Sequence, residues 1–285
     1  MIVDCHVNIW NDGDLIHPLY DQIAISRADA EIPSKADAET LHREMQGVER
    51  AIVFTLKYGR TAGIAGRDET TAAAVKQYPD KFIGFACVDP TEPGALETLR
   101  HAHKTLGLRG VKMGPIYQKF GLDDPRVQPI FRYCERNNLP VTMHMGTTYQ
   151  PDATIEFGRP IHVEPVARRH PELKLIMAHM GHPWEGECIA VFRKMPNVYA
   201  EVSGLFYRPW QFYHTLMLAQ EYAVCHKIFW GTDYPFSRVE EAIAGLKHVN
   251  RYTEGTRLPR VSDENIQAIL HSNPLEHWWH GGYRE

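Results

Sequence analysis

The chain has 285 residues, of which 44% are hydrophobic and 23% are charged, so it has enough apolar material for a folded core and is not intrinsically disordered. Its 31 Lys and Arg residues against 35 Asp and Glu residues give a formal net charge of −4, and no stretch concentrates basic residues. This balance argues against nucleic acid and against a membrane surface as partners. We therefore expect the partner to be a small molecule.

The cysteines point to a reducing compartment. The five lie far apart, at positions 5, 87, 134, 188 and 225, and form no CxxC pair. An odd, scattered set predicts free thiols rather than a disulfide framework. The N-terminus shows no signal-peptide pattern, and no apolar run reaches the roughly eighteen residues of a membrane span. We expect a soluble, cytoplasmic protein.

Taken in order, the chain alternates between short apolar segments and helical patterns. The first strand, within residues 1–10, is followed by an irregular polar segment, 11–35, which is long for a connection and is a candidate functional loop. The other expected strands are 50–54, 82–88, 109–113, 141–144, 173–179, 198–202 and 227–230. The expected helices are 36–46, 68–78, 93–106, 125–136, 160–170, 187–194, 210–222, 238–249 and 263–279.

Eight strand and helix units in a chain of this length predict a (β/α)8 TIM barrel, with an open doubly wound sheet as the alternative. Continuous apolar runs such as Leu175-Ile176-Met177-Ala178 are typical of parallel strands buried on both faces. No linker or compositional break divides the sequence. We therefore expect a single domain covering residues 1–285.

Polar residues of a consistent kind follow the expected strands. His6 and Asn8 alternate on the first strand and so share one face. His144, His179 and Asp233 end three further strands, and in this class of barrel the chemistry lies at the C-terminal ends of the strands. Three histidines and an aspartate at one cavity mouth suit a divalent metal. The alternative is a polar network that only orients the chain.

Five short motifs occur in order along almost the whole chain. They are DCHVN at 4–8, VKMGP at 111–115, TMH at 142–144, MAHMG at 177–181 and WGTDYPF at 230–236. Together they resemble the amidohydrolase superfamily. More narrowly, the sequence is similar to the amidohydrolase-related (amidohydrolase 2) branch, which contains aminocarboxymuconate semialdehyde decarboxylase, resorcylate-type decarboxylases and pyrone or muconolactone lactonases.

This resemblance implies roles for the strand-end residues. His6 and Asn8 stand where the superfamily usually has His-x-His, His144 matches the strand-five ligand and Asp233 matches the strand-eight aspartate. These four would bind one divalent ion, Zn or Mn. His179 matches a histidine that acts on substrate, so the expected catalytic residues are Asp233 and His179.

Asn8 departs from the family pattern. Because a neutral amide is a poorer ligand for Zn²⁺ than imidazole, the site could be weaker, could prefer a harder ion such as Mn²⁺, or could work without metal. Lys112 lies on strand four, where another branch carries a carboxylated lysine. We expect Lys112 instead to bind a substrate carboxylate.

Three functions are compatible with these residues. The first is hydrolysis, in which metal-activated water attacks a lactone, ester or amide carbonyl. The second is metal-dependent decarboxylation of an aromatic or muconate-type acid. The compact length of the chain favours hydrolysis over decarboxylation. In hydrolysis Asp233 would move the water proton and His179 would stabilise the oxyanion. In decarboxylation Asp233 would protonate the substrate carbon. The third is a barrel that only binds a ligand.

Aromatic residues with a few cations around the expected mouth indicate a planar substrate that carries a carboxylate. The expected substrate-binding residues are Lys112, Tyr117, Tyr149, Trp184 and Arg208. A homodimer is implied by the resemblance. Trp278 and Trp279 could supply an apolar contact for it.

Overall fold

The computed structural model describes residues 1–16, 18, 20–21 and 32–284. Its centre is an eight-stranded parallel sheet in which the strands pair in chain order. The strands are β1 (Val3–Asn8), β2 (Arg50–Phe54), β3 (Phe82–Cys87), β4 (Val111–Met113), β5 (Val141–His144), β6 (Leu175–Ala178), β7 (Val198–Glu201) and β8 (Ile228–Phe229). Every expected strand is present, and the predicted TIM barrel is confirmed.

The sheet closes where the first strand meets the segment that follows the last one. The amide of Cys5 donates to the carbonyl of Trp230 at 3.2 Å. The amide of Asp233 donates to the carbonyl of His6 at 2.9 Å, and the amide of Asn8 donates to the carbonyl of Tyr234 at 2.9 Å. These bonds continue the parallel ladder beyond β8. As a result, residues near both ends of the chain meet at one seam.

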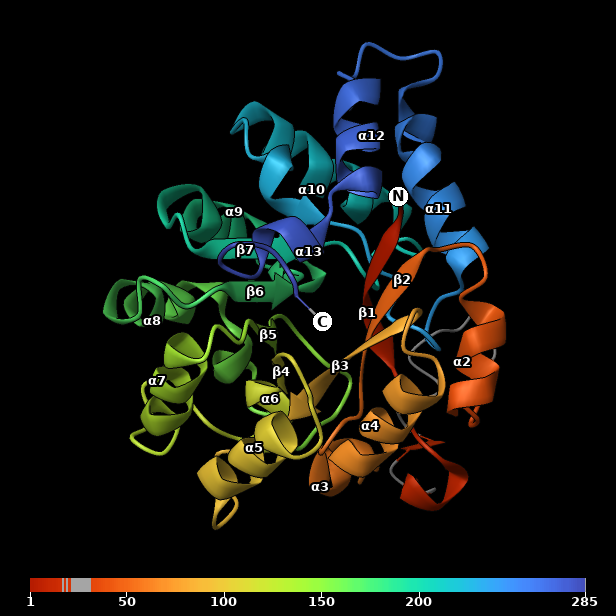
Figure 1. Ribbon diagram of the computed structural model, residues 1–285. Helices are drawn as coiled ribbons and strands as arrows, with labels where there is room; N and C mark the ends of the chain where they lie inside the picture. The colour runs from red at the N-terminus through yellow and green to blue at the C-terminus, as the bar shows by residue number, and fades with distance from the viewer. Residues whose placement is uncertain (17, 19, 22–31, 285) are drawn as a thin grey trace.

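Helices surround the sheet, as Figure 1 shows. The α-helices are α2 (Ala38–Glu44), α3 (Gly59–Ala62), α4 (Asp68–Gln77), α5 (Ala95–Lys104), α6 (Pro115–Gln118), α7 (Gln128–Arg136), α8 (Val163–Arg169), α9 (Glu185–Lys194), α10 (Pro209–Glu221), α11 (Val239–Lys247), α12 (Asp263–His271) and α13 (Pro274–His277). Short 3-10 helices are η1 (Asp12–Asp14), η2 (Ile155–Gly158), η3 (Pro160–His162), η4 (His179–Gly181), η5 (Cys225–Lys227) and η6 (Val249–Thr253).

One expected helix is wrong as a continuous element. The segment 263–279 divides into α12 and α13, because Asn273 caps a new helix by accepting the amide of Leu275. Pro274 occupies the first turn of that helix, where its missing N–H is not needed. The short helices α3 and α6 follow β2 and β4 and were not expected from the sequence.

Residues 17, 19 and 22–31 of the candidate loop 11–35 lie outside the described residues, so its expected role over the site stays a prediction. The two ends of this segment are joined to each other. Trp10 is fully buried, and its indole nitrogen donates to the carbonyl of Ser34 at 2.7 Å. Trp10 and Ala36 also form an antiparallel bridge.

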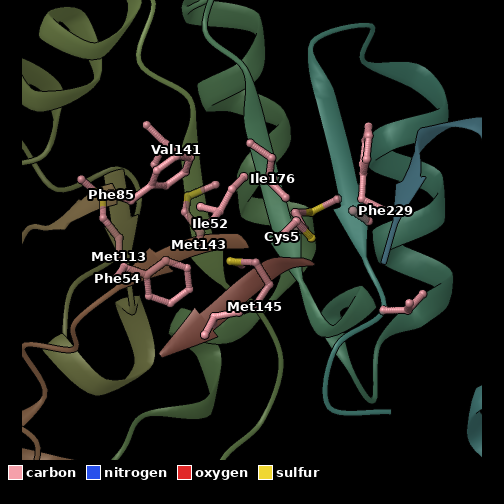
Figure 2. Close-up of a cluster of buried hydrophobic side chains, with 14 of the residues drawn as sticks. Cys5, Ile52, Phe54, Phe85, Met113, Val141, Met143, Met145, Ile176 and Phe229 are labelled. Carbon is pink, nitrogen blue, oxygen red and sulfur yellow. The ribbon is translucent and has the colours of Figure 1, made fainter. Parts of the chain in front are cut away.

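Buried apolar side chains from most of the strands gather in one core (Figure 2). The C-terminal segment joins this core. Trp278 and Trp279 are 0% and 3% exposed and pack against Phe85, and Trp278 also packs against Phe229. The expectation that the two tryptophans supply a subunit contact is therefore wrong, because both are covered within their own chain.

The cysteines agree with the sequence analysis, since all five are free and buried. Within the part of the chain that the structure describes, no helix has the length and hydropathy needed to span a bilayer.

Asp4, on β1, links this strand to the segment that follows β8. Its buried carboxylate accepts the Thr232 amide at 3.0 Å, the Thr232 hydroxyl at 2.7 Å and the His6 amide at 3.1 Å. We expect Asp4→Ala to lower the free energy of unfolding by about 3 kcal/mol, because it leaves several buried donors without a partner. Urea denaturation measures this change. Asp80→Ala, at an exposed position, should stay within about 0.5 kcal/mol of wild type, and equal stability of the two variants would contradict the role of Asp4.

Candidate active site

A pocket opens at the C-terminal ends of the strands. Its lining includes most of the residues that the sequence singled out: His6, Asn8, Lys112, Tyr117, His144, Tyr149, His179, Arg208 and Asp233. Trp184 is not among the lining residues; its ring lies under the guanidinium of Arg159 instead, 5.3 Å away. The barrel therefore brings residues from β1, β4, β5 and the segments after β6, β7 and β8 to one place.

Three side chains in the pocket have the chemistry of a metal site. His6, His179 and Asp233 each offer a ligand atom, and these atoms lie within 4.8 Å of one another. Two imidazoles and one carboxylate are a common ligand set for divalent first-row metals. The family resemblance assigns His179 to the substrate, whereas in the structure its ligand atom lies within this group.

The hydrogen bonds of both imidazoles engage Nδ1 and leave Nε2 as the nitrogen that could bind a metal ion. His6 Nδ1 lies 2.8 Å from Glu201 Oε1, and His179 Nδ1 lies 3.0 Å from the carbonyl oxygen of Ser203. The Ser203 hydroxyl also lies 2.9 Å from His179 Nδ1, but it donates to Glu201 Oε1 and so accepts from the ring. Each Nδ1 therefore carries the hydrogen, and each Nε2 keeps its lone pair. The Nε2 of His6 faces Asp233 Oδ1 at 3.3 Å. Lys112 Nζ lies 3.1 Å from His6 Nε2 and supplies a positive charge beside these two acceptors. The fit to a metal ion rests on the donor set, two imidazoles and one carboxylate.

Glu201 ends β7 and is one of two site residues that the sequence analysis missed. Its fully buried carboxylate accepts from His6 Nδ1, from the amides of His179 and Ser203, and from the Ser203 hydroxyl. A carboxylate behind a metal-binding imidazole fixes the ring and raises its basicity. The signal was present in the sequence, because Glu201 is a lone charge inside the expected strand 198–202.

Asn8 acts through Asp233 in this arrangement. Its amide nitrogen donates to Asp233 Oδ1 at 2.9 Å and to the carbonyl of Tyr234 at 2.8 Å. Both neighbours are acceptors, so the orientation of the amide is well determined. An amide nitrogen cannot bind a cation. Asn8 therefore holds the aspartate in place at the position where the family pattern has a second histidine.

His144 lies beside the group of three rather than within it. Its Nε2 is 3.2 Å from the carbonyl oxygen of Thr147, and its ring packs against those of Tyr117 and His179, with both centroid distances at 4.8 Å. Burial, reinforced by the nearby Lys112, lowers the pKa of His144 to about 3. His144 is therefore a neutral ring in the wall of the pocket.

Left-handed backbone positions two members of the group. His179 and Asp233 have φ angles of 57° and 61°, a region that residues with a side chain rarely adopt. The strand β6 accordingly ends at Ala178, one residue before the expected end, and His179 begins η4. Strain of this kind persists only where the surrounding structure imposes it, and it concentrates at functional sites.

Lys112 provides a buried cation at the floor of the pocket. The residue is 1% exposed, and its Nζ lies 3.1 Å from His6 Nε2 and 4.7 Å from the centre of the Phe54 ring. Burial lowers the pKa of Lys112 to about 8, against the opposing effect of Asp233. Burial also raises the pKa of Asp233 to about 7, although Asn8 and Lys112 act in the other direction.

The upper walls are aromatic and carry a second cation. Tyr58 and Tyr117 stack with ring centroids 4.6 Å apart. Arg208 lies over the Tyr207 ring at 4.5 Å, donates to the Gly204 carbonyl at 2.8 Å, and reaches the Tyr149 hydroxyl at 3.4 Å. These walls leave a pocket suited to a flat, anionic molecule.

Gly204 is a second residue that the sequence analysis missed. A Cβ at this position would lie 3.2 Å from His179 Nδ1 and 3.4 Å from Asp233 Oδ2, and its φ is 70°. Glycine therefore leaves Oδ2 accessible while Oδ1 is occupied by Asn8. In the sequence the residue is an ordinary glycine after a strand, and nothing marks its contact with Asp233.

Comparisons with known proteins identify the family. The amidohydrolase family model matches residues 3–278. The 2-amino-3-carboxymuconate-6-semialdehyde decarboxylase of Dictyostelium discoideum is 25% identical over 236 residues, which are 72% of this chain and 63% of that protein. The match thus spans less than two thirds of that relative's length. The resemblance read from the sequence motifs is confirmed.

Solved structures show the same fold. An uncharacterized TIM-barrel protein of Bordetella bronchiseptica matches with a TM-score of 0.73, 24% identity and coverage of 95% of this chain and 96% of that one. A 5-carboxyvanillate decarboxylase of Novosphingobium aromaticivorans, complexed with manganese and 4-hydroxy-3-methoxy-5-nitrobenzoic acid, matches with a TM-score of 0.69 and 18% identity. The match covers 98% of this chain and 96% of that one. A probable 2-pyrone-4,6-dicarboxylic acid hydrolase of Acinetobacter baumannii, with citric acid bound, matches with a TM-score of 0.66 and 19% identity. The match covers 97% of this chain and 98% of that one.

These matches correct one argument from the sequence. The compact length does not favour hydrolysis, because the decarboxylase is matched over 96% of its own chain. Length therefore does not separate the two reactions.

Glu201 gives a test of the metal site. We expect Glu201→Gln to lower the affinity for Mn²⁺ or Zn²⁺ by about 10- to 100-fold, because the amide no longer fixes the His6 tautomer. Calorimetric titration of metal into the metal-free protein measures the affinity, and thermal melting checks that the variant is folded. Glu240→Gln, on the exposed face of α11, is the control. Unchanged affinity in a folded Glu201→Gln protein would show that Glu201 does not support a metal ligand.

Proposed function

The chain belongs to the amidohydrolase family, and we propose that it is a metal-dependent decarboxylase of a small planar acid of the aromatic or muconate type. The observation that carries this proposal is the group of His6, His179 and Asp233 beside the buried Lys112, at the floor of an aromatic pocket. A carboxylate substrate would find positive charge at the point where the proton donor also lies. The decarboxylases among the related proteins support this choice over hydrolysis.

We assign the metal to His6, His179 and Asp233, with Mn²⁺ or Zn²⁺ as the ion. When bound, the ion would supply charge that attracts the substrate's carboxylate and an adjacent oxygen. Lys112 would contribute a second positive charge to the same carboxylate, and its burial makes that charge act through a weakly screening environment. Tyr117 would contact the face of the substrate, and Arg208 would bind anionic groups at the mouth.

Asp233 is the proposed acid. Its Oδ1 is held by Asn8, while Oδ2 faces the space left by Gly204. Oδ2 would transfer a proton to the carbon that bears the carboxylate, forming a C–H bond. The C–C bond to the carboxylate then breaks, its electron pair returns to the π system and CO₂ leaves. A proton from solvent restores Asp233, so the net reaction consumes one proton and releases one CO₂.

The second candidate is the hydrolysis that the sequence favoured. The same Asp233 Oδ2 could take a proton from water and deliver it to the leaving group of a lactone, ester or amide. The fold shared with the probable pyrone dicarboxylic acid hydrolase keeps this reaction in consideration. It differs from the first candidate in its product, an acid rather than CO₂.

Metal content gives the first test. Elemental analysis for Zn, Mn, Fe, Co and Ni should find about one ion per chain, removable by a mild chelator. His179→Ala should lose the ion, and His144→Ala should keep it, because His144 lies outside the group. Loss from His144→Ala with retention in His179→Ala would instead support the ligand set implied by the sequence. Absence of metal from every preparation would contradict metal dependence.

Turnover gives the second test. Hydroxylated aromatic acids should release CO₂, and lactones, which serve as the control class, should release no acid. Asp233→Asn should lower kcat by about a thousandfold, because it removes the transferred proton, with metal content measured in parallel. The exposed Asp152→Asn is the matched variant and should keep the wild-type rate. Lactone turnover alone would establish the second candidate, and turnover of neither class would leave a barrel that only binds ligand. A full rate in Asp233→Asn would exclude Asp233 as the acid.

A further inference from the structure

His182 is a pocket residue that the proposed reaction does not use. It follows η4, its side chain lines the pocket, and 18% of that side chain is exposed. His182 does not cap the helix that follows, because the N-cap of α9 is Trp184. Among the described residues, His182 also lies outside the group that could hold a metal. It therefore needs another explanation.

The backbone around His182 is tightly fixed. Its amide donates to the carbonyl of His179 at 3.0 Å, and its carbonyl accepts the amide of Thr147 at 2.8 Å. A Cβ on Gly146, which has a φ of 119°, would lie 2.3 Å from the His182 carbonyl oxygen. Only glycine permits this close approach of the two loops. The backbone of His182 is thus held against the loop that follows β5.

A buried carboxylate lies behind the ring. Glu185 is 5% exposed, and its Oε1 accepts the side-chain amide of Gln211 at 2.6 Å. The same oxygen lies 3.6 Å from His182 Nδ1, a buried nitrogen without a hydrogen-bond partner among the described residues, so its effect on the ring is electrostatic. Burial opposes the charge on Glu185, but its polar contacts with His182 and Gln211 outweigh burial and lower its pKa. The carboxylate is therefore ionised and can only accept. It favours the tautomer of His182 with the hydrogen on Nδ1, which leaves Nε2 as an acceptor.

We propose that His182 is a specificity-determining residue whose Nε2 accepts a hydrogen bond from a hydroxyl group of the substrate. Glu185 is the positioning residue that sets the tautomer. This inference deepens the proposed function and rests on it in one respect: the carboxylate of the same substrate binds at the floor near Lys112. The substrate class is then a hydroxylated planar acid, with its hydroxyl directed toward the loop after β6.

Binding of simple ligands tests the proposal without turnover. Dissociation constants for benzoate, 3-hydroxybenzoate and 4-hydroxybenzoate would be measured by calorimetry on the metal-loaded protein. At least one hydroxybenzoate should bind about tenfold more tightly than benzoate, because an unpaired buried acceptor penalises the ligand that lacks the hydroxyl. His182→Phe should remove this difference and leave benzoate affinity within about twofold, since the ring is replaced by one of similar size.

Two further variants make the test specific. In Glu185→Gln the amide can still accept from Gln211 but can donate to His182 Nδ1, which transfers the hydrogen to Nε2 and should also abolish the preference. His162→Phe is the matched control, because His162 pairs with Glu156 at 2.7 Å on the surface, away from the pocket. It should preserve the tenfold preference.

Three results would overturn the proposal. Equal binding of benzoate and both hydroxybenzoates to the wild-type protein would remove the hydroxyl subsite. A preference retained in folded His182→Phe would place that subsite elsewhere, and a preference retained in Glu185→Gln would remove the role of Glu185. A preference that depends on His182 in a protein that releases no CO₂ would reject the proposed reaction while leaving this subsite in place.

Discussion

The site depends on one buried carboxylate, that of Glu201. A carboxylate removed from water is costly unless hydrogen bonds replace its hydration, and here donors from His6, His179 and Ser203 do so. Because these donors come from β1, from η4 and from the residues after β7, satisfying Glu201 also fixes the relative positions of three parts of the barrel. The same charge determines which nitrogen of His6 faces the pocket.

Asn8 departs from the family pattern, but it still helps to arrange the residues of the site. A second imidazole at this position would offer another ligand to a metal. The amide instead donates to Asp233 and to the Tyr234 carbonyl, so it fixes one oxygen of the aspartate and the turn that carries it. Gly204 leaves the other oxygen accessible. The two residues together give the two oxygens of Asp233 different surroundings, which a proton donor requires.

The sequence predicted the barrel because apolar runs and helix boundary signals are local, and it found His6, His144, His179 and Asp233 because each follows such a run. Contacts across the barrel could not be predicted from local sequence patterns. The bonds of Glu201 to His6 and His179 join segments far apart in the chain, and no local pattern shows that His179 turns toward Asp233 while His144 faces Thr147. The left-handed φ of His179 is likewise imposed by its surroundings. The division between α12 and α13 could have been read from Asn273 and Pro274.

The seam between β1 and the segment after β8 has a consequence for how the protein is made. Asn8 and Asp233 are 225 positions apart, yet they share a hydrogen bond at the centre of the site. During synthesis the ribosome releases the first strand long before the residues that complete the pocket. Such contacts carry a high loop-closure entropy and form slowly. The nascent chain therefore has no pocket until its last strand emerges, so function begins only once nearly the entire chain has been translated.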